Sequence, residues 1–448
     1  MLVSKSLRKW FPWRTWIQPW DNIDRWLLIL PIGLTVFGGL VIRSTSLHQG
    51  WIDWLQHWVV GLIGIIFALV IANWPYQTLL SLHWVVYFLV NVSLIAVRYV
   101  GTEALGAQRW ISVAGFHVQP SEFAKVGVII SLAALLHHRS ATKLASILQV
   151  LVITAVPWAL IVIQPDLGTS LVFGAITLGM MYWANANLGW IALAFSPLIS
   201  AILFNLPFAS YWLWMGWAIW IGFVALVAWV SIPKQLWGAV VVVVLNLGSG
   251  AMGRVAWGLL LRDYQKERVI LLLNPEQDPL GGGYHLIQSR IAIGAGQLWG
   301  RGLNQGTQTG LNFIPEQHTD FIFSAVGEQF GFVGCLLLIV TLWLICLRLV
   351  RVALKAPDDF GSLIAIGVLS MVVFQVFVNL SMTVGLAPVT GIPLPWLSYG
   401  RSAMLTNFIS IGLVESVANH SKKRRFLECA SFSFSPFQCF SLSRRAMK

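Results

Sequence analysis

The chain has few charged residues: only 10% of its 448 residues are Asp, Glu, Lys or Arg. A soluble domain carries roughly 25% charged residues, so a soluble globular protein is excluded. Hydrophobic residues make up 57% of the chain. They recur in apolar runs of about 17–25 residues, the length at which an α-helix crosses a bilayer. The short alternating segments of a strand barrel are absent from the sequence. The composition predicts an all-α polytopic integral membrane protein.

Cysteine is also scarce, and the 4 cysteines show no metal-binding or redox spacing. Cys335 and Cys346 fall on one predicted helix, about 16 Å apart by helix rise, which is too far for a disulfide. The formal net charge of +12 would suit nucleic acid if the protein were soluble. Here the basic residues fall in end segments and short loops, and Trp suits bilayer interfaces. Membrane topology explains the charge, and no nucleic-acid partner is expected.

The apolar runs predict about 10–12 transmembrane helices. The candidate spans are residues 26–42, 55–74, 78–97, 121–136, 146–163, 167–184, 188–206, 210–231, 235–250, 320–347, 361–384 and 397–418. A basic segment over 1–25 precedes the transmembrane domain at 26–420, and a tail follows at 421–448. The first run is too long for a signal-peptide core and is interpreted as a signal anchor. Basic residues in alternate loops predict that both termini are cytoplasmic.

Two predicted extracytoplasmic loops are long enough to carry function, residues 98–120 and 251–319. The second is a large loop that precedes the span starting near residue 320. Its stretch YHLIQSRIAIGAGQ is predicted to form short interfacial helices.

Ionisable residues cluster in Leu311–Gly334, LNFIPEQHTDFIFSAVGEQFGFVG, at the start of a predicted span. The cluster consists of Glu316, His318, Thr319, Asp320 and Glu328. Charges at a bilayer boundary are costly and are therefore candidates for function. Thr319 or Asp320 is a candidate N-cap of the following helix. Asp320 is also a candidate general base, or a ligand of a metal that binds phosphate, and the two interpretations are compatible.

A second polar group lies in RWISVAGFHVQPSEFAK, residues Arg109–Lys125. Ser121 is predicted to cap a helix that begins here, and Glu122 is favoured in its first turn. Lys125 lies one turn further inside and needs an anionic partner, either Glu122 or a ligand phosphate. Arg109 is a second donor for anions.

Irregular segments interrupt the apolar runs at QPDLGT (Gln164–Thr169) and GLAPVTGIPLPWLSYG (Gly385–Gly400). Non-helical backbone at membrane depth needs cover from protein or a wet cavity, so a central cavity opening outward is predicted. Asp166 is expected to cap the span at 167 and to join a polar network.

Two classes of membrane protein stay open at this point. One is a transporter or flippase for an anionic or lipid-linked substrate, which the lack of an evident inverted repeat disfavours. The other is an intramembrane transferase.

These motifs, together with DYQKERV, NPEQDPLGGGYH and GTQTGL, occur in the order typical of the SEDS family (shape, elongation, division and sporulation; RodA, FtsW and SpoVE). The chain resembles this family over about residues 25–420, and it is most similar to the RodA-like members. The resemblance implies a peptidoglycan glycosyltransferase in the bacterial cytoplasmic membrane. Such an enzyme polymerises lipid II into glycan strands at the outer face during cell elongation and releases undecaprenyl diphosphate. A lipid II flippase is the alternative.

The resemblance also assigns roles to residues. Asp320 of HTDFIF becomes the essential catalytic carboxylate. The implied substrate-binding residues are Arg109, Gln119, Glu122, Lys125, Glu316 and His318, and Asp166 and Ser398 belong to a polar network. No cofactor is certain, and a divalent cation, Mg²⁺ or Mn²⁺, is the one candidate. The implied partners are a class B penicillin-binding protein transpeptidase and the MreB, MreC and MreD elongation complex.

The sequence departs from the family pattern in a few places. Gln297 and Arg401 stand where Gly is usual, Gln329 where Glu is usual, and Ala403 where Ser is usual. Arg401 is expected to change the shape of the cavity near its loop, and it adds a cation that can bind a phosphate. Family members typically have ten spans, and residues 207–250 provide apolar sequence for an extra helix pair. An added pair preserves the topology, so the catalytic loop still faces outward.

Overall fold

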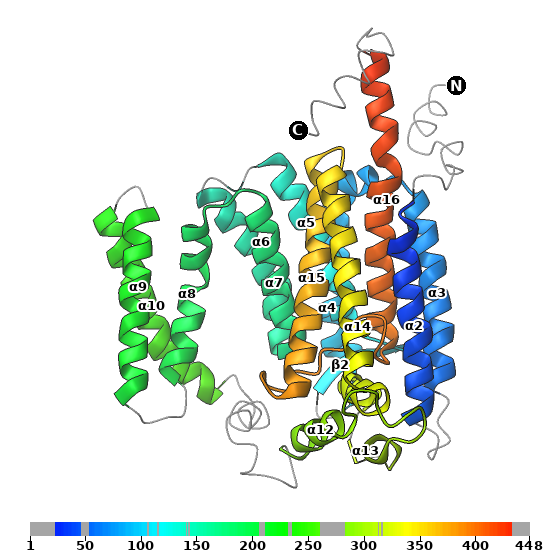
Figure 1. Cartoon of the computed structure of the whole chain (residues 1–448). Helices are drawn as coiled ribbons and strands as arrows, with labels where there is room; N and C mark the ends of the chain where they lie inside the picture. Colours follow the sequence, from blue (N-terminus) through cyan, green and yellow to red (C-terminus); the bar gives the residue numbers. More distant parts are fainter. Residues whose placement is uncertain are drawn as a thin grey trace.

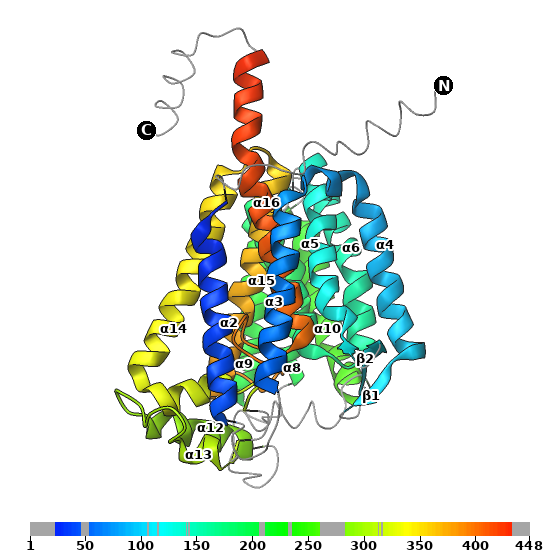
Figure 2. The same ribbon diagram turned by 90° about the vertical axis from the view of Figure 1, so that its right-hand side faces the viewer.

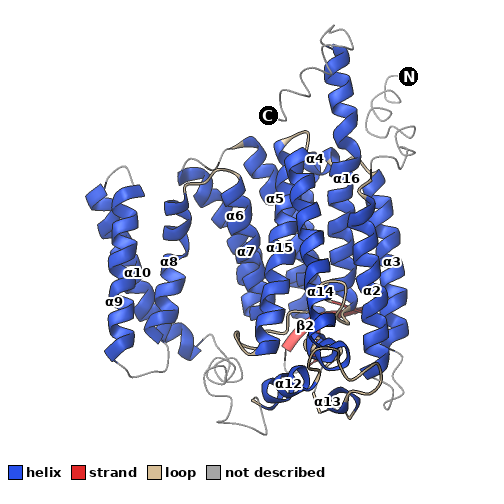
Figure 3. Cartoon of the chain, viewed as in Figure 1, coloured by secondary structure: helices blue, strands red, loops and turns tan. Residues whose placement is uncertain are grey.

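The computed structural model describes residues 23–45, 53–104, 107–113, 116–139, 141, 144–205, 211–231, 235–259, 283–311, 313–314 and 317–431. In this part of the chain, long helices run side by side in a bundle, and strands are confined to one end (Figure 1, Figure 3). Eight of the described helices are long and apolar enough to cross a membrane. The predicted all-α polytopic class is confirmed.

The helices follow the predicted spans closely. They are α2 (Arg25–Thr45), α3 (Asp53–Asn73), α4 (Gln77–Val100), α5 (Pro120–His138), α6 (Leu144–Ile163), α7 (Leu167–Trp183), α8 (Leu188–Asn205), α9 (Tyr211–Ser231), α10 (Gln235–Leu259), α12 (Tyr284–Ala295), α13 (Thr307–Gly310), α14 (Ile322–Lys355), α15 (Asp359–Val384) and α16 (Arg401–Ser431). Several helices continue beyond their predicted limits, and α14, predicted to end at residue 347, ends at Lys355. α10 extends into the stretch predicted as loop from residue 251, and α16 extends into the stretch predicted as tail from residue 421.

Helices α8, α9 and α10 pack on one another at the side of the bundle (Figure 1). α9 and α10 occupy most of the stretch predicted as an extra helix pair. Buried hydrogen bonds join α8 to α10: Ser200 Oγ donates to the Asn246 carbonyl at 2.8 Å, and Asn246 Nδ2 donates to Ser196 Oγ at 2.9 Å. Such bonds hold apolar helices together where no hydrophobic effect acts between them.

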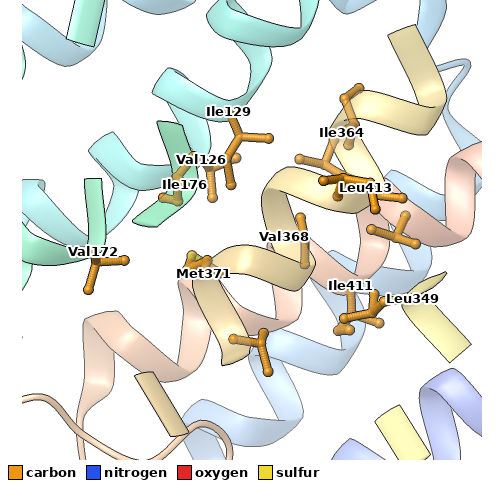
Figure 4. Close-up of a cluster of buried hydrophobic side chains, with 14 of the residues drawn as sticks. Val126, Ile129, Val172, Ile176, Leu349, Ile364, Val368, Met371, Ile411 and Leu413 are labelled. Carbon is orange, nitrogen blue, oxygen red and sulfur yellow. The ribbon is translucent and has the colours of Figure 1, made fainter. Parts of the chain in front are cut away.

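The core of the bundle is formed where α5, α7, α14, α15 and α16 meet (Figure 4). Its labelled side chains are Val126, Ile129, Val172, Ile176, Leu349, Ile364, Val368, Met371, Ile411 and Leu413. A Cβ at Gly367 would lie 2.7 Å from Ile129 Cγ2, so glycine is what lets α15 approach α5 this closely. α16 packs along α3, and its polar residues Ser402, Asn407 and Ser410 are buried among other helices.

A small antiparallel sheet occupies part of residues 98–120, which the sequence predicts as a loop. β1 (Thr102–Ala104) pairs with β2 (Ala107–Val113), and β2 pairs with β3 (Phe116–Val118). The central strand contains Trp110, Ile111 and Val113, aromatic and β-branched residues that favour strands. Because the strands are so short, their alternation is too brief to be recognised in the sequence.

The sheet, α12, α13 and the first turn of α14 lie together at one end of the bundle (Figures 1 and 2). The C-terminal part of α16 lies at the opposite end (Figure 1). The helix predicted within YHLIQSRIAIGAGQ is confirmed as α12. Residues 260–282 of the predicted second loop lie outside the described residues, so the extent of that loop stays a prediction.

Helix α14 is kinked at Gly331, whose φ is 63° and ψ −161°. The turn after α12 binds this kink: Phe332 N donates to the Gln297 carbonyl at 2.8 Å and Val333 N to the Leu298 carbonyl at 3.1 Å. A Cβ at Gly331 would collide with the backbone nitrogen of Gly300. The kink therefore needs glycine for both its backbone conformation and its space.

Replacement of Gly331 by alanine is expected to destabilise the protein, because the positive φ alone costs about 1–3 kcal/mol and the Cβ displaces the turn at Gly300. Gly294→Ala is the matched control, since no atom lies within 4 Å of a Cβ there and alanine favours the helix. Thermal unfolding in detergent micelles measures both. Equal melting temperatures for the two variants would contradict this account of the kink.

Candidate functional site

Three motifs that are far apart in the sequence meet at the end of the bundle that holds the sheet. Gln119, before α5, donates from Nε2 to Asp166 Oδ2 at 2.9 Å, and its backbone N–H donates to Ser402 Oγ at 2.9 Å. Asp166 precedes α7. A Cβ at Gly168, in the first turn of α7, would lie 2.5 Å from the Thr390 carbonyl. The QPSE, QPDLGT and PVTGIP motifs are therefore in contact.

Asp166 is the N-cap residue of α7, as predicted: its Oδ1 accepts from Thr169 N at 3.2 Å and its Oδ2 from Thr169 Oγ1 at 2.9 Å. The prediction that Ser121 caps α5 is wrong. The N-cap residue of α5 is Gln119, without a side-chain cap bond, and Ser121 Oγ instead donates to Asp166 Oδ2 at 3.5 Å. A tertiary partner thus takes the place of the local cap. The buried carboxylate of Asp166 accepts from Gln119 and Ser121 as well as from its own helix, which joins the starts of α5 and α7.

Lys125 and Glu122 form a buried ion pair, with Nζ and Oε2 2.7 Å apart and side chains 1% and 5% exposed. Of the two partners predicted for Lys125, this structure has Glu122. Each charge would be expensive to bury alone, so each holds the other in place. Glu122 is the last residue of the QPSE motif, and Lys125 lies one turn further along α5.

Arg109 extends from β2 to the end of α6. Its Nε donates to the Gln164 carbonyl at 3.3 Å, and its Nη2 donates to the Pro165 carbonyl. A cation is favourable where a helix ends, because the last carbonyls carry partial negative charge. Arg109 is half-buried. It therefore fixes the QPDLGT turn and brings a positive charge to the same end of the bundle.

Asp320 lies in the turn before α14 and is half-buried. The prediction that Thr319 or Asp320 is the N-cap residue of this helix is wrong, because that residue is Phe321, which makes no side-chain cap bond. The Asp320 carboxylate is instead placed beside the 385–400 segment: a Cβ at Gly391 would lie 3.4 Å from Asp320 Oδ2. Gly391 has a φ of 72°, which favours glycine.

Asn379 of α15 ties the turn to that segment, and it is a residue that the sequence reasoning missed. Its Nδ2 donates to the Asp320 carbonyl at 3.0 Å and to the Ile392 carbonyl at 2.8 Å. The signal available in the sequence was an amide within an otherwise apolar span. Through residues 390–392 the Asp320 turn reaches Gly168, and so the network around Asp166.

His318 lies on the same turn and contacts Tyr399. Tyr399 N donates to the His318 carbonyl at 2.8 Å, and the two rings are 5.7 Å apart. The Tyr399 hydroxyl donates to Gln56 Oε1 at 2.9 Å, and Arg401 Nε donates to that hydroxyl at 3.2 Å. Glu316 lies outside the described residues.

One further hydroxyl group, of Ser398, and one further carboxylate, of Glu328, make hydrogen bonds at this end of the bundle. Ser398 Oγ accepts from Leu394 N at 2.8 Å and closes a turn within the 385–400 segment. Glu328 is fully buried on α14 and accepts from Gln308 N at 2.8 Å, Thr309 N at 2.9 Å and Thr309 Oγ1 at 2.7 Å. Glu328 thus binds the GTQTG motif and fixes α13 against α14.

Three carboxylates at this end, those of Asp166, Glu122 and Glu328, are held by protein donors. Within the described ranges, no group of three or more His, Cys, Asp or Glu side chains is placed to hold a metal ion. Asp166 accepts from side chains and backbone, and Glu122 is paired with Lys125. These residues alone do not assemble the six-oxygen shell that Mg²⁺ prefers. The divalent cation stays a prediction, and no step below passes through it.

The fold and this site define a polytopic helical membrane protein whose sequence motifs converge at one end. A family model described as "Cell cycle protein", covering FtsW, RodA and SpoVE, matches residues 23–213 and 214–423. The chain belongs to the FtsW/RodA/SpoVE family, and the predicted family is confirmed.

Named relatives match along nearly their whole length. The chain is 35% identical over 425 residues to peptidoglycan glycosyltransferase RodA of Treponema pallidum, covering 89% of this chain and 98% of that one. It is 33% identical over 408 residues to peptidoglycan glycosyltransferase MrdB of Escherichia coli K12, covering 90% and 96%.

Solved structures share the fold. One is described as "Structural coordination of polymerization and crosslinking by a peptidoglycan synthase complex". Its chain has a TM-score of 0.66 and 26% sequence identity to this one, and the match covers 90% of this chain and 99% of that chain. Another is the Thermus thermophilus rod shape determining protein RodA, with a TM-score of 0.59 and 22% identity over 90% and 99%, which supports the fold alone.

Removal of one partner of the buried pair is expected to be far more damaging than removal of both. Lys125→Met leaves the Glu122 carboxylate buried without its partner, which costs about 3–5 kcal/mol. The double replacement Glu122→Leu and Lys125→Met is expected to recover most of that loss. Thermal unfolding in detergent measures the three proteins. A double variant that is no more stable than the single one would contradict a mainly structural ion pair.

Proposed function

We propose that this chain is a RodA-type peptidoglycan glycosyltransferase that polymerises lipid II into glycan strands and releases undecaprenyl diphosphate. The enzyme class is the one that the T. pallidum and E. coli relatives carry in their names, at 35% and 33% identity over almost the whole chain. The observation that carries the assignment of a site is the placement of Asp320. Its carboxylate lies beside Gly391, and its carbonyl is bound by Asn379, at the end where the motifs converge.

Asp320 is the proposed general base. Its carboxylate takes the proton from the 4-hydroxyl of the acceptor sugar while that oxygen attacks C1 of the donor. The bond between C1 and the diphosphate oxygen breaks in the same displacement, and the diphosphate leaves with its electron pair. One displacement inverts the configuration at C1, which converts the α-linked donor into a β-linked polymer. The reaction then needs one base and stabilisation of the leaving group, with no covalent intermediate.

Stabilisation of the departing diphosphate requires positive charge near it. Arg109 is the better-placed candidate, because it is half-buried at this end and its guanidinium is charged at every working pH. Lys125 is paired with Glu122, which offsets its charge. We propose that Gln119, Glu122, Lys125, Glu316 and His318 contact the substrate. A divalent cation, if bound, would act as a Lewis acid on the diphosphate.

The orientation that we propose places Asp320 at the outer face of the cytoplasmic membrane. Basic residues gather at the opposite end of the bundle, where Arg139 follows α5 and Arg348, Arg351 and Lys355 end α14. This distribution is typical of the cytoplasmic ends of spans, and it predicts that both termini are cytoplasmic.

We further propose a class B penicillin-binding protein as the crosslinking partner and MreB, MreC and MreD as the surrounding elongation complex. The relative in the peptidoglycan synthase complex supports the first of these.

Asp320→Ala is expected to abolish polymerisation, because it removes the proposed general base. The assay uses the full chain in lipid nanodiscs with a class B transpeptidase and fluorescently labelled lipid II, and products are separated by gel electrophoresis. General-base removal lowers a rate by about 10²–10⁴. Expression and melting temperature are expected to stay close to those of the natural chain.

Asp359→Ala is the matched control, since this exposed carboxylate lies at the start of α15, at the opposite end of the bundle. Full polymerisation by the Asp320 variant would refute the assignment.

A vesicle assay that follows the movement of labelled lipid II across the bilayer tests the flippase alternative. Translocation without polymer formation by the natural chain would support a flippase. Loss of polymer in the folded Glu122 and Lys125 double variant supports substrate contact by that pair.

A further inference from the structure

We propose that Asn379 is a positioning residue for the Asp320 carboxylate, an inference that rests on the proposed function. Asn379 lies in the second-last turn of α15 and is fully buried. Its single amide nitrogen uses both hydrogens: one bond goes to the Asp320 carbonyl at 3.0 Å and the other to the Ile392 carbonyl at 2.8 Å. One side chain therefore connects the backbone of the candidate base to the backbone of the segment that faces it.

The chemistry of the partners fixes the direction of this amide. Both partners are backbone carbonyls, which only accept hydrogen bonds, so the nitrogen of Asn379 and not its oxygen has to face them. Neither Asp nor Leu can supply two donors in this space. The contacts are also far apart in the sequence, 59 residues for Asp320 and 13 for Ile392, so no local turn can replace them.

The geometry links these bonds to the carboxylate. Ile392 follows Gly391, whose Cβ position lies 3.4 Å from Asp320 Oδ2. When Asn379 holds both the Asp320 carbonyl and the Ile392 carbonyl, it fixes the distance between the carboxylate and the backbone beside it. Other hydrogen bonds also hold the turn: the Gln317 side chain donates from Nε2 to the Thr45 carbonyl at 3.2 Å, and Tyr399 N donates to the His318 carbonyl at 2.8 Å. Of these ties, the one made by Asn379 is at Asp320 itself.

Loss of the Asn379 amide is expected to affect the chemical step and not substrate binding. Asn379 makes no bond to the carboxylate oxygens, so its removal leaves the base chemically intact but less well placed. A displacement of about 1 Å at a reacting group can lower a rate by about 10²-fold. Of the substrate contacts proposed above, Gln119, Glu122 and Lys125 lie on another segment, and His318 is held to Tyr399 by a separate backbone bond. The expected signature is a lower kcat at an unchanged KM for lipid II.

The test measures lipid II polymerisation by the full chain in nanodiscs with its transpeptidase partner, for Asn379→Leu, Asp320→Ala and the double variant. Asn379→Leu is expected to lower kcat about 10–100-fold and to change KM less than twofold. The double variant is expected to be no less active than Asp320→Ala alone, because a positioning residue has no effect once the base is gone. Gln375→Met is the matched control: Gln375 is fully buried one turn earlier on α15, and its side-chain nitrogen and oxygen have no partner among the described residues.

Asn379→Asp keeps the proposal testable if the leucine variant does not fold. A protonated aspartic acid retains one donor, whereas the ionised form has none and repels both carbonyls. The kcat of this variant relative to the natural chain is therefore expected to fall as the pH rises. A ratio near one at every pH, or an unchanged kcat for Asn379→Leu with inactive Asp320→Ala, would overturn the positioning role alone. Full activity of Asp320→Ala would overturn the base assignment, and the positioning role with it.

Discussion

The arrangement of this protein depends on one constraint: backbone that leaves the helical conformation inside a membrane protein must find its hydrogen bonds within the protein. The 385–400 segment meets this constraint through its neighbours. Ile392 is bound by Asn379, Leu394 by Ser398 and Tyr399 by the carbonyl of His318. The bond from Ser398 closes a turn within the segment, and the bonds with Asn379 and His318 attach the segment to α15 and to the Asp320 turn. The irregular segment is therefore held rigidly, and it becomes the surface against which the other motifs are placed.

The same bonds connect the apolar core to the polar end. Helix α15 packs through Val368 and Met371 into the core shared with α5 and α7 (Figure 4). Further along the same helix, Asn379 reaches the Asp320 turn. The carboxylate proposed as the base is thus supported by a helix that the bundle fixes along its length. Such support gives the fixed geometry that acid–base catalysis needs.

The sequence predicted the helices well because apolar runs of spanning length depend on local composition alone. It also predicted the Asp166 cap, whose partner Thr169 lies in the next turn of the chain. It failed where a distant partner decides. Ser121 bonds to Asp166 rather than capping its own helix, and the turn at Asp320 is tied by Asn379, 59 residues away. Spacing along a chain carries no information about such contacts. Family resemblance identified Asp320 as the candidate base, and the structure identified Asn379 as the residue that binds its backbone.

The central claim is that the Asp320 carboxylate faces the acceptor hydroxyl of lipid II. The most direct measurement uses a lipid II analogue with a carboxylate-reactive diazo group in place of the acceptor 4-hydroxyl. The full chain in nanodiscs is treated with this analogue, and the modified residue is located by mass spectrometry. The account predicts an ester on Asp320 that natural lipid II prevents. Modification of Glu328 or Asp166 instead, with Asp320 unmodified, would contradict it.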